Sequence, residues 1–147
     1  MQVSFALFAD AANLSQEGKL NILGVFDAVQ VAQLPTVHPR AHLVLRLKGT
    51  RADVGAHRMT MRWVDPAGRE LVSSTGELNV GTPPGGLNDI DVPLIATLDL
   101  PLEQAGLYTL AILLDDEPMV TVPLQVRGGA PPMPAGFGGG GGPTLMS

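Results

Sequence analysis

Hydrophobic and polar residues alternate with a period of two along most of residues 1–127. This is the period of β-strands that have one buried and one solvated face, whereas an amphipathic helix repeats about every 3.6 residues. Residues 107–114 differ because they are apolar on both faces, which is typical of a central strand between two packed layers. The runs with the clearest alternation are 43–48, 59–63 and 94–100.

Turn-forming residues separate these runs at short intervals. Asp65, Pro66 and Gly68 suit a type I turn, because proline presets the backbone at its second position and glycine closes it. This turn predicts a hairpin that joins strands over residues 59–64 and 70–80.

Two further turn signals, at residues 15–18 and 115–118, predict additional hairpins. The first leads from the opening strand into a strand over 19–31, and the second follows the central strand. Together with the other runs we expect about eight strands, and no helix longer than one turn near Leu102–Gln104.

Tyr108 follows Gly106 at the start of the central strand. A tyrosine at this place resembles the tyrosine corner of Greek-key sandwiches, in which the hydroxyl bonds back to the preceding loop. In that setting the side chain stabilises a crossover and has no catalytic role. The expected fold is therefore all-β: an antiparallel two-sheet β-sandwich, immunoglobulin-like, of about eight strands.

The composition changes at Arg127. The 9 Lys and Arg and the 14 Asp and Glu residues all lie at or before this position, whereas residues 128–147 are rich in glycine and proline. Such a segment buries too little apolar surface to offset the entropy of ordering it. We predict a β-sandwich domain over 1–127 and a flexible tail over 128–147. Its large apolar side chains that could contact a partner are Phe137, Leu145 and Met146.

Composition and charge exclude several classes of function. The chain has no cysteine, so disulfides, thiolate nucleophiles and cysteine-bound metals are ruled out. With a net charge of −5 and few aromatic residues, it is a poor candidate for binding nucleic acid. Its apolar runs are too short to span a membrane. We expect a cytoplasmic protein that binds neither nucleic acid nor membranes.

The residue patterns predict no catalytic or metal site. His38 and His42 have the spacing of helical metal ligands, but Pro39 disfavours a helix there, and in an extended chain the two side chains lie more than about 10 Å apart. The acidic cluster 115–117 lacks the alternating ligands of a calcium loop. The glycine-rich loop 81–86 contains two prolines, which lack the amide donors that a phosphate needs. We expect no catalytic residue, no cofactor and no metal.

Four basic side chains project from the solvated faces of two strand runs. On an otherwise acidic domain they could form one basic stripe that docks an acidic protein partner. The alternative is a solvated face on which each cation pairs with Asp or Glu. The four residues are Arg46, Lys48, Arg58 and Arg62.

The opening motif Ala9-Asp10-Ala11-Ala12-Asn13, followed by Glu17-Gly18-Lys19-Leu20-Asn21-Ile22-Leu23-Gly24-Val25-Phe26-Asp27, resembles a family of small bacterial proteins that is classed as a domain of unknown function. Three later segments fit the same pattern: Leu45-Arg46-Leu47, Asp65-Pro66 with Gly68, and Gly106-Leu107-Tyr108. The resemblance covers roughly residues 1–127. It implies a bacterial, single-domain, all-β protein, and it supplies no activity and no functional residues.

Two classes of function remain. The favoured one is a non-enzymatic protein-binding or assembly module, which acts on a protein partner or by self-association. The alternative is a small-ligand-binding protein or enzyme with a pocket that the sequence does not reveal. In that case the first candidates would be Asp10, Asp27 and Asp89.

Overall fold

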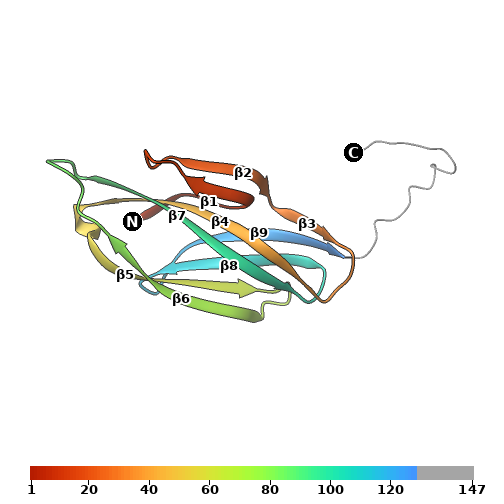
Figure 1. Cartoon of the computed structure of the whole chain (residues 1–147). Helices are drawn as coiled ribbons and strands as arrows, with labels where there is room; N and C mark the ends of the chain where they lie inside the picture. The colour runs from red at the N-terminus through yellow and green to blue at the C-terminus, as the bar shows by residue number, and fades with distance from the viewer. Residues whose placement is uncertain (129–147) are drawn as a thin grey trace.

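The computed structural model describes residues 1–128, which form nine strands in two packed sheets (Figure 1). The four-stranded sheet has the order β2-β1-β4-β7 and the five-stranded sheet the order β3-β9-β8-β5-β6. The first sheet consists of β1 (Gln2–Leu14), β2 (Leu20–Phe26), β4 (Thr36–Thr50) and β7 (Asp89–Leu102). The second consists of β3 (Ala28–Val31), β5 (Gly55–Val64), β6 (Glu70–Val80), β8 (Gly106–Leu114) and β9 (Glu117–Gly128).

The predicted all-β sandwich is confirmed, and so are its three hairpins. Strand β5 pairs with β6 across the Asp65 turn, in which the Gly68 amide donates to the Asp65 carbonyl at 2.9 Å. Strands β1 and β2 pair across 15–18, and β8 and β9 across 115–116. The apolar run 107–114 lies in β8, between β9 and β5. It is the central strand that its two apolar faces predicted.

The expectation of no helix longer than one turn is confirmed for residues 1–128, but the turn does not lie near Leu102–Gln104. Leu102 pairs with Thr36 and ends strand β7, and the backbone of Gln104 is held by the hydroxyl of Tyr108 in an open turn. Within residues 1–128 the helical turn is instead a 3₁₀ turn, η1 (Arg51–Asp53).

The single strand expected over 19–31 is divided between the two sheets. Strand β2 pairs antiparallel with β1, whereas β3 pairs parallel with β9. The change of sheet occurs at Asp27, whose carbonyl accepts a hydrogen bond from the Gln125 amide of β9 at 2.8 Å. One strand pair of the sandwich is therefore parallel, because the chain crosses from one sheet to the other within this segment.

The β1–β2 hairpin folds back over the outer face of the four-stranded sheet (Figure 1). The bend occurs where Gly24, with φ of 73°, lies beside Asp10. A hollow is lined by Phe5 and Pro93 of the sheet and by residues 17–20 and Ile22 of the hairpin. This cover explains why Val44 is 0% exposed although it points away from the core between the sheets.

Aromatic side chains join the two sheets in the core. Trp63 of β5 stacks on Tyr108 of β8, with ring centroids 5.2 Å apart. Phe8 of β1 meets the edge of Trp63 across the sandwich at 6.2 Å. The Trp63 Nε1 donates to the carbonyl of Pro101 on β7 at 2.9 Å. Because buried indole N–H groups need an acceptor, this hydrogen bond fixes how β5 and β7 face each other.

Candidate interaction surface

Strand β6 forms an open edge of the five-stranded sheet (Figure 1). It pairs with β5 on one side, and within residues 1–128 no strand lies along its other side. Its central residues, Ser73 to Glu77, are exposed. The strand contains neither proline nor lysine, which are the residues that natural sheets use to block such edges.

The other sheet edges of residues 1–128 are short or interrupted. Strand β3 has only four residues, and β2 bends at Gly24. Strand β7 contains Pro93 and Pro101, which lack the amide that a further strand would need. Strand β6 is therefore the long edge of this part of the chain that is best able to accept another strand.

The face of β6 that turns toward the core carries an exposed valine. The register places Val72 beside the buried Trp63 and Gly76 beside Met59. Val72 is nevertheless 46% exposed, because β6 is the fifth strand of its sheet and faces a sheet of four. Leu78 lies on the same face and is half-buried. Two apolar side chains thus flank a shallow centre of Ser74 and Gly76.

The opposite face of β6 is polar. Thr75 pairs with Thr60 of β5, and their hydroxyl oxygens are 3.3 Å apart. Ser73 lies beside Arg62 in the same register. Because these hydroxyl side chains are small, they leave the backbone groups along the free edge of β6 accessible.

Glu77 carries the charge nearest to the centre of β6. Its carboxylate accepts a hydrogen bond from Asn79 at 3.2 Å. Arg58 lies beside it in register but forms its ion pair with Asp116. Within residues 1–128 no cation forms an ion pair with Glu77, so its carboxylate is available to a partner.

A network of hydrogen bonds links three chain segments beside this edge. The Nδ1 of His57 is 2.6 Å from a carboxylate oxygen of Asp115, and its Nε2 is 2.6 Å from the carbonyl of Asp53. The Asp53 carboxylate binds the Met1 amino group at 3.2 Å and the Thr50 amide at 2.8 Å. Both nitrogens of His57 are occupied, so in this arrangement the ring connects segments and holds no free position for a metal or a substrate.

These contacts favour the charged forms of the pair. The hydrogen bond from His57 to Asp115, together with that to the Asp53 carbonyl, raises the pKa of His57. The amide of Arg58 and the ring of His57 lower the pKa of Asp115. The stabilisation from His57 is complete below its unfolded pKa of about 6.5 and is lost as the pH rises through the raised folded value. The stabilisation from Asp115 is present above about pH 4 and is lost as the pH falls through its lowered folded pKa.

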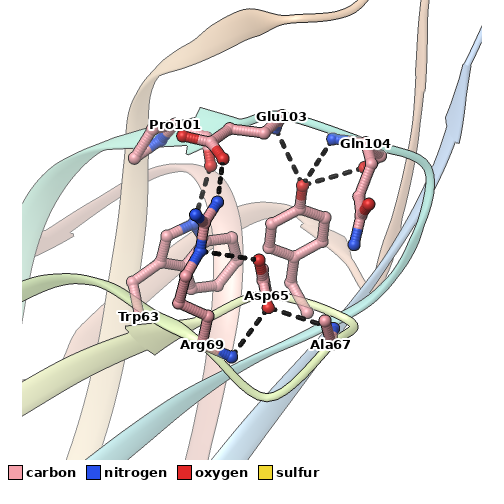
Figure 2. A network of polar contacts seen from close by, with 8 residues as sticks. Trp63, Asp65, Ala67, Arg69, Pro101, Glu103 and Gln104 are labelled. Carbon is pink, nitrogen blue, oxygen red and sulfur yellow. Dashed lines mark hydrogen bonds and ion pairs between the residues drawn. The ribbon is translucent and has the colours of Figure 1, made fainter.

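The predicted tyrosine corner is present beside Trp63, at the end of β5 far from His57. Figure 2 shows its hydrogen bonds to the loop that contains Glu103 and Gln104. The Tyr108 hydroxyl accepts hydrogen bonds from the amides of Glu103 and Gln104 at 2.8 and 3.0 Å, and donates to the carbonyl of Gln104 at 2.8 Å. Tyr108 is 0% exposed. The two hydrogen bonds that its hydroxyl accepts and the one that it donates all go to the loop, so the side chain holds the β7–β8 crossover.

Asp65 organises the neighbouring turn (Figure 2). It is 6% exposed, and one carboxylate oxygen accepts from the amides of Ala67 and Arg69 at 3.0 and 2.8 Å. The guanidinium of Arg69 lies 3.5 Å from the other oxygen and also binds Glu103. This set of contacts ties the β5–β6 turn to the β7–β8 turn and fixes where β6 begins.

The four basic residues of the predicted stripe lie in two separate pairs. Arg46 and Lys48 are on β4 in the four-stranded sheet, whereas Arg58 and Arg62 are on β5 in the five-stranded sheet. The solvated faces of the two sheets point in opposite directions, so the four side chains do not form one continuous stripe. Each cation pairs with a carboxylate, as the alternative interpretation predicted. The partners are Asp91 for Arg46 and Lys48, Asp116 for Arg58 and Glu70 for Arg62.

The two histidines of β4 do not face each other. The ring of His38 packs on Phe26 at 5.4 Å, and the Nδ1 of His42 lies 3.1 Å from the carbonyl of Arg40. A bulge at Arg40, with φ of 51°, interrupts the register between them. His57 lies on the other sheet.

The acidic candidates are also dispersed. Asp10 lies beside Gly24 in the β1–β2 hairpin. Asp27 follows β2, and Asp89 begins β7 opposite Thr50. Within residues 1–128 no three such side chains gather in a way that could hold a metal ion. The predicted tail contacts, Phe137, Leu145 and Met146, lie outside the described residues, as does the tail itself.

Sequence reasoning did not find the β6 edge. The available signal was the run Ser73-Ser74-Thr75-Gly76-Glu77, which is polar on both faces. Such a strand has little to bury and suits a sheet border. Its position at the border follows from the strand order, which the pattern along one strand does not contain.

Two packed sheets with a tyrosine corner and a long open edge define a β-sandwich domain. Within residues 1–128 no helix is long and apolar enough to cross a membrane.

A family model described as a family of unknown function, DUF6941, matches residues 4–127. The chain belongs to this family, so the expected membership of a domain-of-unknown-function family is confirmed. No curated protein matches the chain.

Proposed function

We propose that this protein is a non-enzymatic protein-binding or assembly module, and that it binds by accepting a strand at β6. The observation that carries the proposal is the open edge: the eleven-residue strand β6 has a strand on one side only and contains neither proline nor lysine. An extended segment of a partner added there would satisfy the free backbone groups, and its alternate side chains would supply specificity. A cytoplasmic location is part of the proposal, since a chain without cysteine needs no oxidising compartment.

An immunoglobulin-like arrangement is also part of the proposal. In immunoglobulin domains a buried tryptophan lies on strand C and a tyrosine corner at the start of strand F. Trp63 on β5 and Tyr108 on β8 support this correspondence, because β5 and β8 are neighbours in one sheet and β7 precedes the tyrosine corner. In this correspondence β6 takes the place of the added strand that borders strand C in variable-type domains.

The test is an affinity capture from the host lysate with matched baits. The full chain is compared with Thr75→Lys, which places a charge at the centre of the β6 edge, and with Thr121→Lys, which makes the same change at an exposed threonine of β9. We expect a partner to be retained by the full chain and by Thr121→Lys and lost with Thr75→Lys. Each captured protein is then purified and added back during amide hydrogen exchange.

A strand added at β6 must slow the exchange of amides within Glu70–Val80, because an outward-facing amide gains a hydrogen bond only on that edge. Capture that is equal with all three baits would contradict the proposal. Slower exchange confined to other strands would contradict it as well.

A further inference from the structure

We infer that the strand which β6 accepts is β6 of a second copy of this chain, paired antiparallel about a two-fold axis at Thr75. The inference rests on the proposed function and names its partner. Such an isologous contact needs a surface that is complementary to itself. The sequence and register of β6 provide this on both of its faces.

The midpoint of the strand determines the register. Strand β6 spans Glu70–Val80, so Thr75 is its central residue. Pairing Thr75 with Thr75 of the second copy sets residues 72–78 of the two copies opposite one another, and all of these lie after the bulge that precedes Val72. The pairing of β6 with β5 is regular from Val72 to Val80. A regular strand presents evenly spaced backbone groups on its free side as well.

The core-facing side of β6 matches itself in this register. Val72 lies opposite Leu78 of the second copy, and Leu78 opposite its Val72. The 46% exposed Val72 thereby gains an apolar neighbour, which is the type of cross-strand pair that stabilises sheets. Between these two pairs, Ser74 lies opposite Gly76, so the centre has no bulky side chain to prevent a close approach.

The polar side also matches itself. The hydrogen-bonded hydroxyls of Thr60 and Thr75 continue across the axis into Thr75 and Thr60 of the second copy, a row of four threonines. Threonine pairs are among the favourable cross-strand contacts.

Charge complementarity supports the same register. Ser73 lies opposite Glu77 of the second copy, and Arg62 is the next residue in that row. Because serine is short, the arginine can reach over it to the carboxylate. Glu77 has no ion pair with a cation of residues 1–128, and Arg62 holds Glu70 only loosely, at 3.5 Å.

A neighbouring register is less favourable. Centring the pair on Ser74 would place Val72 opposite Gly76, so Val72 would gain no apolar neighbour, and Leu78 would lie at the bulge that interrupts β6 before Val72. The Thr75 register brings no like charges into opposite positions. Complementarity of this kind favours a second copy over an unrelated segment.

The first experiment measures the mass of the full chain by sedimentation equilibrium over a range of concentrations. Because one strand from each copy makes the contact, we expect a weak, concentration-dependent association. The mass should rise from 15.3 kDa toward twice that value by about 1 mM protein. Thr75→Lys, which opposes two cations at the axis, should remain a monomer, and Thr121→Lys should associate like the unmodified chain.

The second experiment tests the register by cross-linking, for which a chain without cysteine is suited. Residues directly opposite in an antiparallel pair have Cβ atoms about 5 Å apart, within reach of a disulfide after a small adjustment. Thr75→Cys alone should therefore form a covalent dimer on oxidation. Ser73→Cys alone should not, because its two copies lie about 13 Å apart along the strands. A mixture of Ser73→Cys and Glu77→Cys should form the mixed dimer.

The outcomes separate this inference from the proposed function. A chain that stays monomeric at about 1 mM, or a dimer that survives Thr75→Lys, overturns self-pairing through β6. Cross-linking of Ser73→Cys with itself overturns the register. If self-pairing fails while a captured partner still protects β6 from exchange, the proposed function stands with a different partner. If β6 is neither self-paired nor protected by a partner, both are wrong.

Discussion

Replacing Tyr108 with phenylalanine tests whether the tyrosine corner stabilises this fold. The substitution keeps the ring, its stacking on Trp63 and its burial, and removes only the hydroxyl. Three hydrogen bonds of 2.8, 3.0 and 2.8 Å are lost with it. The amides of Glu103 and Gln104 and one carbonyl are then left to find other partners.

The expected loss of stability follows from these three bonds. A neutral hydrogen bond contributes about 1 kcal/mol net, and leaving buried partners unsatisfied costs more. Residues Glu103 and Gln104 are themselves exposed, so water can replace part of what the hydroxyl provided. We expect the free energy of unfolding to fall by about 1.5–3 kcal/mol. For a domain of this size that corresponds to a melting temperature lower by about 5–10 °C.

Urea unfolding followed by tryptophan fluorescence is a suitable assay, because Trp63 is the single tryptophan and lies 5.2 Å from the ring of residue 108. The slope of the free energy against urea should not change, since the buried surface is nearly the same. Thr121→Val, which removes an exposed hydroxyl on β9, is the control and should change stability by less than about 0.5 kcal/mol. A free energy for Tyr108→Phe within that same margin of the unmodified chain would refute the structural role assigned to the hydroxyl.

Two further predictions concern His57 and Gly106. The raised pKa of His57 makes its contact with Asp115 a source of stability that fades as the pH rises. In urea titrations the unmodified chain should therefore lose stability between pH 5.5 and 8.5, and His57→Gln should weaken or remove this loss. An unchanged pH profile would count against this. Gly106→Ala should destabilise more than Gly55→Ala. Both glycines have positive φ, 135° and 127°, but only at Gly106 would the new Cβ meet the ring of Pro66, at 2.7 Å; equal melting temperatures would contradict the close approach.

The sequence by itself determined the class of fold and most of the strands. Alternation in residues 59–63 and the turn at Asp65 predicted the β5–β6 hairpin, and the two apolar faces of 107–114 predicted a central strand. Gly106 and Tyr108 predicted the corner that the hydroxyl forms. These features are local: a period of two, a turn residue and a short loop each depend on a few neighbouring residues.

Only the tertiary structure decided how the strands are shared between the sheets. The pattern of residues 19–31 predicted one strand, but at Asp27 the chain crosses to the other sheet, where β3 runs parallel to β9. Likewise Arg46 and Arg58 have the same local pattern and lie on different sheets. The open edge of β6 depends on the same information. Strand order is set by which faces bury one another across the whole domain, and the pattern along a single strand is equally compatible with an edge or a centre.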